Sequence, residues 1–329
     1  MREKAMQYKP LGRTGVQVSQ LCFGTMSFGG DADEKESARM YGRCREAGIN
    51  FFDCADGYSR GKAETILGKL IKGERDNLVI TSKCFNPMGD DINMRGGNRR
   101  HILGAVEASL KRLGTDRIEV LFMHRWDPDV PLEETLRALE DLVRAGKVLY
   151  LGASNYAAWM IARGLGISER RGWARFDVIQ PMYSLVKRQA ESEIFPLALH
   201  EGLGVITYSP VGGGLLSGKY GSKTRPGQGR LMTNQEYIAR YGEDWVFETA
   251  DAFTAMAGKL GVHPVSLAVA WAAAHPAVTC PIVGARNLEQ LEPSLASVDI
   301  DMTPELHARI AALSRTPPPA TDRLEEMKK

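Results

Sequence analysis

The sequence contains no long run of apolar residues, no block of like charge and no metal-type spacing of cysteines. None of its apolar stretches reaches the length needed to cross a bilayer, and the first six residues lack the apolar core of a secretory signal, so we expect no membrane partner. The formal net charge of +2 gives no reason to expect a nucleic-acid partner. The five cysteines are an odd, scattered set typical of free thiols in a reducing compartment, which predicts a cytoplasmic protein without a metal site.

What is present suits a large α/β domain. The chain has 329 residues, of which 43% are apolar, enough to bury a full core. We expect residues 1–329 to form one domain. Within it, residues 315–329 should be an extended tail, because they include three consecutive prolines.

Short apolar runs alternate along the chain with longer segments of helical periodicity. The runs are apolar nearly throughout, as strands buried on both faces of a parallel sheet are. They span residues 20–26, 50–55, 78–84, 120–124, 148–154, 177–182, 204–209 and 279–283. About eight strand–helix units predict a (β/α)8 TIM barrel, and an open doubly wound sheet is the alternative.

Two of the intervening segments carry clear helix signals. Residues 132–143 repeat leucine or valine at helical spacing, and Gly146 suits the position just past the helix end. Residues 102–113 do the same, with Asn98 as a candidate N-cap and Gly114 after the last turn.

Two further regions depart from the alternation. Residues 8–18 resemble a small β-hairpin with a glycine-containing turn. Residues 211–246, after the seventh strand, form a long glycine-rich insertion with basic residues, and loops of this length in a compact domain are usually functional or mobile.

Polar residues close several of the predicted strands. Asp53, Lys83 and His124 end the second, third and fourth strands, and Tyr58 lies in the loop after Asp53. The later strands end in or run into Ser154, Asn155, Gln180, Tyr208, Gly284 and Arg286. In an α/β barrel these ends meet at one mouth, where chemistry is carried out.

Each of these residues alone has an ordinary structural explanation: a solvated lysine, a packed histidine or an aspartate that caps a turn. Together, four titratable groups at one mouth should perturb one another's pKa values. A lysine ammonium beside Tyr58 should stabilise the phenolate and lower the pKa of the phenol, Asp53 could hold that ammonium, and His124 could orient a carbonyl oxygen. Such a set suits proton delivery to oxygen while hydride, which no side chain supplies, reaches carbon from a cofactor.

The motifs that carry these residues resemble the aldo-keto reductase family over nearly the whole chain, as a bacterial-type member related to the potassium-channel β-subunit branch. The resemblance lies in Asn50 to Tyr58 (NFFDCADGY), Ile80 to Lys83 (ITSK) and Phe122 to Pro128 (FMHRWDP), which occur in order on successive strands. It implies a catalytic tetrad of Asp53, Tyr58, Lys83 and His124, with Tyr58 as the proton donor.

The same resemblance implies an NADPH/NADP+ cofactor. Gly152 to Asn155 and Gln180 resemble the residues that hold the nicotinamide carboxamide, Tyr208 resembles the aromatic that stacks on its ring, and the glycine-rich segment after it resembles a loop that closes over the pyrophosphate. Arg286 is the candidate for a 2′-phosphate, with Arg230 as a possible second. The full set of expected cofactor contacts is Gly24, Thr25, Met26, Asp53, Ser154, Asn155, Gln180, Tyr208, Ser209, Pro210, Val211, Gly212, Gly214, Leu215, Ser217, Gly218, Lys219, Arg230, Gly284, Arg286, Gln290 and Ser294.

Some positions depart from the family pattern. Pro293-Ser294 stand where many relatives have Glu-Asn, so adenine contacts are in doubt. Cys54 stands beside Asp53 and should face the helices, because adjacent strand residues point to opposite faces. Cys84 is expected to be structural as well. No Gly-x-Gly-x-x-Gly fingerprint follows the first strand, which weakens the open-sheet alternative.

The sequence leaves the substrate open beyond a small-molecule carbonyl compound. Met26, Phe28, Phe85, Trp126 and Tyr183 sit at or just past strand ends and predict an apolar or aromatic pocket. Reduction of an aldehyde or ketone is the expected activity. The alternatives are an NADP-dependent alcohol dehydrogenase, a regulatory NADPH-binding subunit and a barrel isomerase that binds a sugar phosphate. The oligomeric state cannot be read from the sequence.

Overall fold

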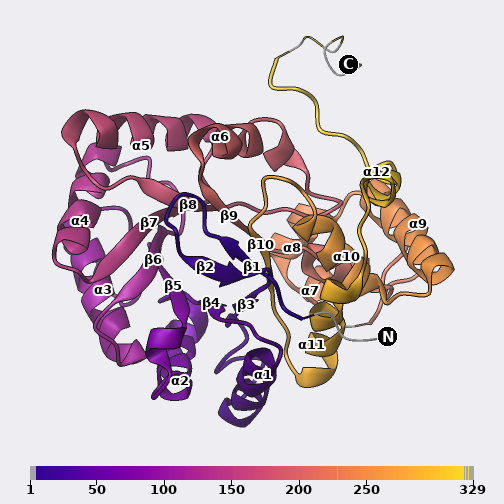
Figure 1. Ribbon diagram of the computed structural model, residues 1–329, viewed down its shortest axis with the longest axis horizontal. Helices are drawn as coiled ribbons and strands as arrows, with labels where there is room; N and C mark the ends of the chain where they lie inside the picture. Colours follow the sequence, from indigo (N-terminus) through magenta and orange to yellow (C-terminus); the bar gives the residue numbers. More distant parts are fainter. Residues whose placement is uncertain (1–4, 228, 322, 324, 326–329) are drawn as a thin grey trace.

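The computed structural model describes residues 5–227, 229–321, 323 and 325. Eight parallel strands close into a barrel in the order β10-β3-β4-β5-β6-β7-β8-β9, with helices outside them (Figure 1). The predicted (β/α)8 TIM barrel is therefore confirmed, and the open doubly wound sheet is excluded. No helix within the described ranges is both long enough and apolar enough to span a membrane.

The strands of the barrel coincide with the apolar runs of the sequence. Their bounds are β3 Cys22–Gly24, β4 Phe51–Asp53, β5 Val79–Cys84, β6 Ile118–Met123, β7 Val148–Ser154, β8 Phe176–Gln180, β9 Gly204–Thr207 and β10 Cys280–Val283. The helices are α1 Glu34–Glu46, α2 Lys62–Leu70, α3 Arg99–Leu113, α4 Leu132–Arg144, α5 Ala158–Arg171, α6 Ile194–Glu201, α7 Arg230–Thr233, α8 Gln235–Tyr241, α9 Asp244–Leu260, α10 Pro264–Ala273, α11 Leu288–Leu295 and α12 Pro304–Ala311.

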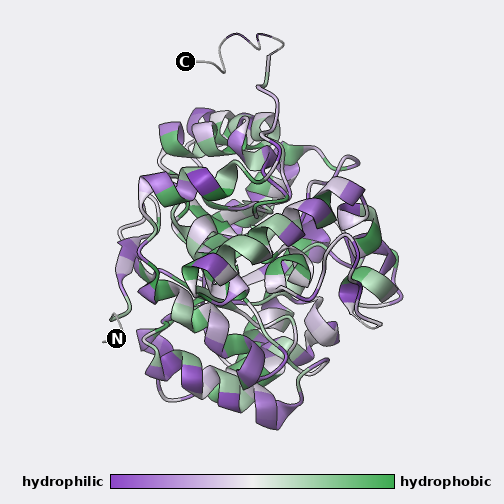
Figure 2. Cartoon of the chain, turned by 90° about the vertical axis from the view of Figure 1, so that its right-hand side faces the viewer, coloured by the Kyte–Doolittle hydropathy of each residue, from purple (hydrophilic) through white to green (hydrophobic). Residues whose placement is uncertain are grey.

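The two helices with the clearest sequence signals form as expected. Asn98 caps α3 by accepting a 2.9 Å hydrogen bond from the His101 amide, and Gly114 ends it in the left-handed conformation. α4 buries its leucines against the barrel and leaves acidic and basic residues outside. Figure 2 shows the same mixture of apolar and polar residues on most of the outer helices.

Alternation along each strand divides the apolar residues between two cores. In β4, Phe51 points into the barrel, whereas Phe52 and the following Cys54 pack between strands and helices. Cys54 and Cys84 are both buried in this outer core, as expected of packing residues. Inside the barrel, Gly152 makes room for a neighbour, because a Cβ there would lie 2.3 Å from the ring of Phe122.

An antiparallel hairpin closes the amino-terminal end of the barrel, as predicted. It consists of β1 (Tyr8–Pro10) and β2 (Gln17–Ser19), and it lies across the ring of strands in Figure 1. Leu11 and Val18 join the apolar interior of the barrel. The turn fits tightly, since a Cβ on Gly12 would lie 2.3 Å from the backbone nitrogen of Gly204, where β9 begins.

The insertion after β9 is partly helical, which the sequence did not predict. It contains a short 3-10 helix, Gly212–Ser217, followed by α7 and α8. At the other end of the chain, residues 315–321 have no helix or strand and lead away from the barrel (Figures 1 and 2), while the last positions of the expected tail lie outside the described residues.

Candidate active site

Four side chains from three consecutive strand ends meet at the carboxyl-terminal mouth of the barrel. Asp53 ends β4, Lys83 lies near the end of β5, His124 follows β6, and Tyr58 begins the short helix after β4. The barrel register aligns β4 with β5 and places Lys83 beside Phe122 of β6. The sequence therefore identified residues that the fold does bring together.

Lys83 is the centre of this group. Its fully buried ammonium donates to Oδ2 of Asp53 at 2.6 Å, to the backbone oxygen of Cys54 at 2.8 Å and to the hydroxyl of Tyr58 at 3.1 Å. An ammonium has three donors, so its capacity is filled. Burial alone would lower the pKa of Lys83, but Asp53 and Tyr58 raise it above its ordinary value, and the charge is retained.

The hydroxyl of Tyr58 belongs to a phenol and not to a phenolate. Burial raises the pKa of Tyr58, Lys83 lowers it and Asp53 raises it, which leaves a pKa of about 12. Lys83 lowers the pKa of Tyr58, as expected, but the desolvation of the buried phenol outweighs it and the net shift is upward. A protonated Tyr58 that accepts a hydrogen bond from an ammonium is suited to give up its proton to an oxygen.

His124 completes the group and is neutral. Burial lowers the pKa of its imidazole to about 3, and the charges of Lys83 and Arg125 contribute in the same direction. Its ring stands edge-on to Tyr58 with the centroids 6.1 Å apart. A neutral imidazole beside a phenol can hydrogen-bond an oxygen without competing as an acid.

A chain of hydrogen bonds links this group to residues expected at the nicotinamide. Oδ1 of Asp53 accepts from Nε2 of Gln180 at 2.9 Å, and Ser154 donates to the backbone oxygen of Gln180. Asn155 donates to Ser154, and the hydroxyl of Tyr208 donates to Oδ1 of Asn155 at 2.6 Å. These hydrogen bonds connect the ends of β4, β7, β8 and β9. We call the connected side chains of Asp53, Ser154, Asn155, Gln180 and Tyr208 the polar floor of the site.

The glycine-rich segment after β9 has a backbone conformation that depends on its glycines. Gly212, Gly213 and Gly214 have φ values of 62°, 67° and 101°, a conformation that side chains disfavour, and Lys219 is exposed beyond them. Successive amides freed of side chains form a surface on which a phosphate can be held. The segment is therefore physically suited to an anionic group.

The insertion reaches across to the other side of the mouth. Arg230, at the start of α7, forms a 3.2 Å ion pair with Asp31 of the loop after β3. The end of β10 lies between these two loops in the barrel order. Arg230 therefore binds the protein itself in this structure, whereas the guanidinium of the exposed Arg286 makes no ion pair with any residue in the described part of the chain.

More than half of the residues expected to hold a dinucleotide are accessible at the mouth. Gly24 and Gly284 lie at adjacent strand ends, and a Cβ built on Gly284 would meet no atom closer than 3.6 Å. Among the expected contacts, the following are exposed or half-exposed: Met26, Asn155, Tyr208, Ser209, Val211, Gly214, Ser217, Gly218, Lys219, Arg230, Gly284, Arg286 and Gln290. No cluster of metal ligands exists within the described residues.

The other expected contacts are buried: Gly24, Thr25, Asp53, Ser154, Gln180, Pro210, Gly212, Leu215 and Ser294. Thr25 donates its hydroxyl to the backbone oxygen of Asp53, and Leu215 belongs to the outer core. Ser294 lies inside α11 with 3% of its surface exposed, so it offers almost nothing to an adenine. Because these three side chains are buried, they pack beneath the surface and cannot line a groove for the cofactor.

The expected substrate pocket is only partly open. Phe85 and Trp126 are half-buried at the ends of β5 and β6, and Met26 is 43% exposed. Phe28 and Tyr183 do not line a pocket, because both have 0% of their surface exposed and pack in the core. Tyr183 stacks on Trp271 with ring centroids 5.2 Å apart.

Sequence reasoning missed several residues around the site. Asn86 and Arg125 contact His124 or each other, and Trp159 packs its ring 5.6 Å from that of Trp126 while 57% of it stays exposed. Their only signal in the sequence was a position within a few residues of a strand end.

Asp56 is a buried carboxyl close in sequence to Asp53 and has no role in the arrangement described above. It is fully buried three residues after Asp53, and neither carboxyl oxygen has a hydrogen-bond partner within the described residues. Burial raises the pKa of Asp56 to about 7, and the neighbouring Glu64 adds to the rise.

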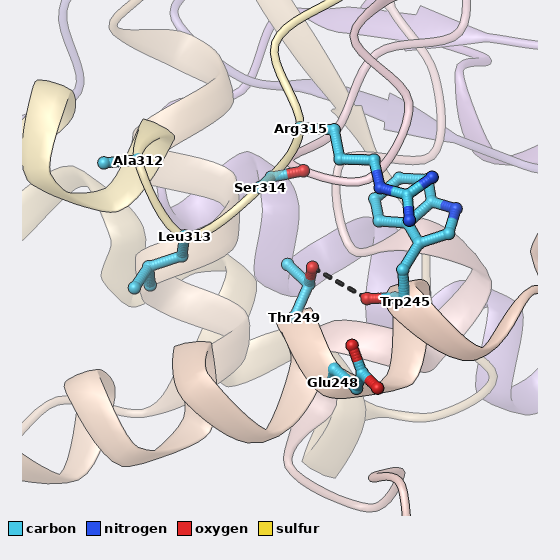
Figure 3. Close-up of a pocket in the computed structure, with 7 residues that line it drawn as sticks. All are labelled: Trp245, Glu248, Thr249, Ala312, Leu313, Ser314 and Arg315. Carbon is cyan, nitrogen blue, oxygen red and sulfur yellow. Dashed lines mark hydrogen bonds between the residues drawn. The ribbon is translucent and has the colours of Figure 1, made fainter.

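A separate pocket of about 300 Å³ lies between α9 and the segment after α12 (Figure 3). Arg315 covers the ring of Trp245 at 4.8 Å there, and the backbone oxygen of Trp245 accepts a hydrogen bond from Thr249. None of the four polar side chains at the barrel mouth lines it. The pocket is therefore distinct from the candidate site.

Comparisons with known proteins identify the family of the chain. The aldo/keto reductase family model matches residues 20–315. An uncharacterized oxidoreductase, YrpG, of Bacillus subtilis is 38% identical over 92% of this chain and 94% of its own length. A probable voltage-gated potassium channel subunit beta of Oryza sativa is 36% identical over 96% of this chain and 99% of its own. Versiconal hemiacetal acetate reductase of Aspergillus parasiticus is 34% identical over 91% of this chain and 94% of its own length.

Proposed function

Because this chain belongs to the aldo/keto reductase family, we propose that it catalyses the NADPH-dependent reduction of an aldehyde or ketone to an alcohol. The single observation that carries the proposal is the pair of contacts made by Lys83, 2.6 Å to Asp53 and 3.1 Å to the hydroxyl of Tyr58. That arrangement holds a protonated phenol against a fixed positive charge, which is the state needed to protonate an alkoxide as it forms.

In this mechanism the chain positions both reactants and moves one proton. His124 would hydrogen-bond the carbonyl oxygen and orient the substrate. When bound, a nicotinamide cofactor would supply the hydride to the carbonyl carbon. Tyr58 gives its proton to the oxygen, and Lys83 stabilises the phenolate that remains until solvent reprotonates it. Asp53 keeps Lys83 in place.

The cofactor would be held by the polar floor and by the glycine-rich segment. Asn155 and Gln180 would bind the carboxamide, and Tyr208 would stack on the nicotinamide ring. The backbone after Val211, with Lys219, would bind the pyrophosphate. The guanidinium of Arg286, which forms no ion pair with the described residues, would select NADPH over NADH by binding the 2′-phosphate.

Burial raises the pKa of Tyr58 and keeps the phenol protonated, which is the form that a reduction requires. Alcohol oxidation needs the phenolate as a base, and a phenol with a pKa of about 12 is almost fully protonated at neutral pH. We therefore propose that the chain works as a carbonyl reductase, with oxidation by NADP+ as a slower reverse reaction.

The test is turnover of NADPH and NADH with aldehydes, ketones, quinones and sugar-derived carbonyls, followed as loss of reduced-nicotinamide absorbance. Tyr58→Phe keeps the ring and removes the proton, so it should abolish turnover while NADPH binding, read from quenching of tryptophan fluorescence, stays within about twofold. Turnover by Tyr58→Phe at the wild-type rate would refute the assigned role of Tyr58.

A second candidate is a regulatory subunit that binds NADPH without appreciable turnover. It is favoured by the potassium channel beta subunits named among the relatives. Tight NADPH binding with no turnover on the whole carbonyl panel would favour this candidate. The buried Lys83 bonded to both Asp53 and Tyr58 supports the enzyme instead.

A further inference from the structure

Two residues outside the tetrad make contacts that bear on which nitrogen of His124 carries its proton. Nδ2 of Asn86 lies 3.3 Å from Nδ1 of His124, and Nη2 of Arg125 donates to Oδ1 of Asn86 at 3.0 Å. Neither residue carries a role in the proposed reaction. Both lie just past strand ends, Asn86 after β5 and Arg125 after β6.

The orientation of the Asn86 amide follows from the chemistry of its neighbours. A guanidinium can only donate hydrogen bonds, so the atom of Asn86 that faces Arg125 must be the carbonyl oxygen. The opposite end of the amide, which faces His124, is then the NH2 group, which is only a donor. Nδ1 of His124 must accept from it, and in a neutral imidazole the proton then resides on Nε2.

Other contacts hold this arrangement in place. The guanidinium of Arg125 lies over the ring of Phe85, 5.3 Å from its centroid. Asn86 packs against Gly57 of the loop that leads to Tyr58, where a Cβ would lie 3.3 Å from Nδ2 of Asn86. On the far side, Asn155 donates to the backbone oxygen of His124 at 2.8 Å. Nε2 of His124 has no hydrogen-bond partner in the described part of the chain and is left to donate.

We propose that Asn86, oriented by Arg125, is a positioning residue that fixes His124 in the tautomer with its proton on Nε2. This inference rests on the proposed function, because it explains how a neutral histidine is kept as a hydrogen-bond donor to the substrate oxygen. The opposite tautomer would set an N–H of the ring against the NH2 of Asn86 and would leave Nε2 able only to accept. Such a ring could not bind a carbonyl oxygen.

Asn86→Asp separates this role from a merely structural one. A carboxylate keeps the contact with Arg125 and gains charge complementarity to it, but it accepts where the amide donates. It should therefore pull the proton of His124 onto Nδ1. A structural role for Asn86 predicts near wild-type turnover for this variant, whereas the tautomer role predicts that kcat falls by about 100-fold, the loss typical of removing one donor to a developing oxyanion.

The charge change has a matched control. Asn77→Asp introduces the same charge at an exposed position just before β5, at the other end of the barrel, and should leave kcat and KM unchanged.

In Asn86→Asp, the dissociation constant for NADPH should stay within about twofold, since the residue acts only on the reacting oxygen. The kcat of the variant should also rise towards the wild-type value as the pH falls, because the imidazolium form of His124 carries a proton on Nε2 again. A carboxylate beside His124 raises the pKa of the imidazole, against the lowering charges of Lys83 and Arg125.

The tautomer can be read without turnover. Nitrogen-15 spectra of the imidazoles distinguish a protonated from an unprotonated ring nitrogen, and loss of one set of signals in His124→Asn assigns His124 among the six histidines. We expect the wild type to carry the proton on Nε2 and Asn86→Asp to carry it on Nδ1. A proton on Nδ1 in the wild type, or wild-type kcat in Asn86→Asp, would overturn the inference. If the wild type is inactive but carries the proton on Nε2, the proposed reaction is refuted, whereas the role of Asn86 in fixing the tautomer of His124 is supported.

Discussion

Nζ of Lys83 lies 2.6 Å from Oδ2 of Asp53, and neither side chain has more than 3% of its surface exposed. Removing one member of such a pair leaves the other as a buried charge without compensation. We expect Asp53→Asn to lower the free energy of unfolding by about 3–5 kcal/mol, measured by urea denaturation.

Two further variants check the cause. The double variant Asp53→Asn, Lys83→Met removes both charges and should recover most of that stability. Lys69→Met breaks the exposed ion pair with Glu34 and should change stability by less than about 1 kcal/mol. Equal losses in Asp53→Asn and Lys69→Met would contradict the buried character of the first pair.

The pH profile of the proposed reduction follows from two shifted groups. His124 has a pKa of about 3 and Tyr58 a pKa of about 12, so neither changes charge in the middle of the pH range. Rising pH removes the proton donor only as it approaches the pKa of Tyr58. We therefore expect kcat, measured with saturating substrate, to be flat between about pH 6 and pH 9. An alkaline limb centred near neutrality would show that Tyr58 titrates far lower than its surroundings imply.

Asp56 should make the protein less stable as the pH rises. Its pKa of about 7 lies above the ordinary value of 3.8, because it is buried and lies near Glu64, so the folded state holds a proton that the unfolded chain releases. Its favourable contribution is complete below the unfolded pKa and is lost as the pH rises through the folded pKa. Asp56→Asn should therefore match the wild type near pH 4 and exceed it by roughly 2–4 kcal/mol near pH 8.

The measurement is chemical denaturation across that pH range. Asp90→Asn, an exposed change on the loop between β5 and α3, should leave the curve of stability against pH unaltered. A constant difference between Asp56→Asn and the wild type at every pH would mean that Asp56 does not titrate in the folded protein.

Cofactor choice should depend on Arg286. Loss of its paired, charge-assisted hydrogen bonds to a 2′-phosphate should raise KM for NADPH in Arg286→Gln by roughly 10- to 100-fold and leave KM for NADH almost unchanged. Arg309→Gln removes the same charge from exposed α12 and serves as the control. Similar changes for both cofactors would place the 2′-phosphate elsewhere.

The parts of the fold that sequence reasoning captured are those fixed by local burial. Strands buried on both faces must be apolar nearly throughout, so all eight appeared as continuous runs. Period-two alternation likewise separated Asp53, which faces the barrel mouth, from Cys54, which packs in the outer core. Order along the chain was enough to bring Asp53, Lys83 and His124 to one end of the barrel.

What escaped the sequence depends on side-chain direction and desolvation. Tyr183 and Phe28 follow strand ends as Phe85 does, yet they turn inward and are buried. Asn86 meets His124 only because two loops fold over each other, which no spacing encodes. The raised pKa of Tyr58 reflects the loss of water around the phenol, a quantity that the proximity of Lys83 alone does not reveal.

The hairpin of β1 and β2 closes the amino-terminal end of the barrel with Leu11 and Val18, so the site is reached from the carboxyl-terminal mouth. A molecule that reaches the site must therefore enter through this mouth and leave through it. Under the proposed function, the dinucleotide and the carbonyl compound would share this one passage, and the one that binds deeper would have to bind first and leave last. Under the proposed function, the order in which the two reactants bind would then depend on the twelve residues Tyr8 to Ser19, which close the far end of the barrel and take no part in the chemistry.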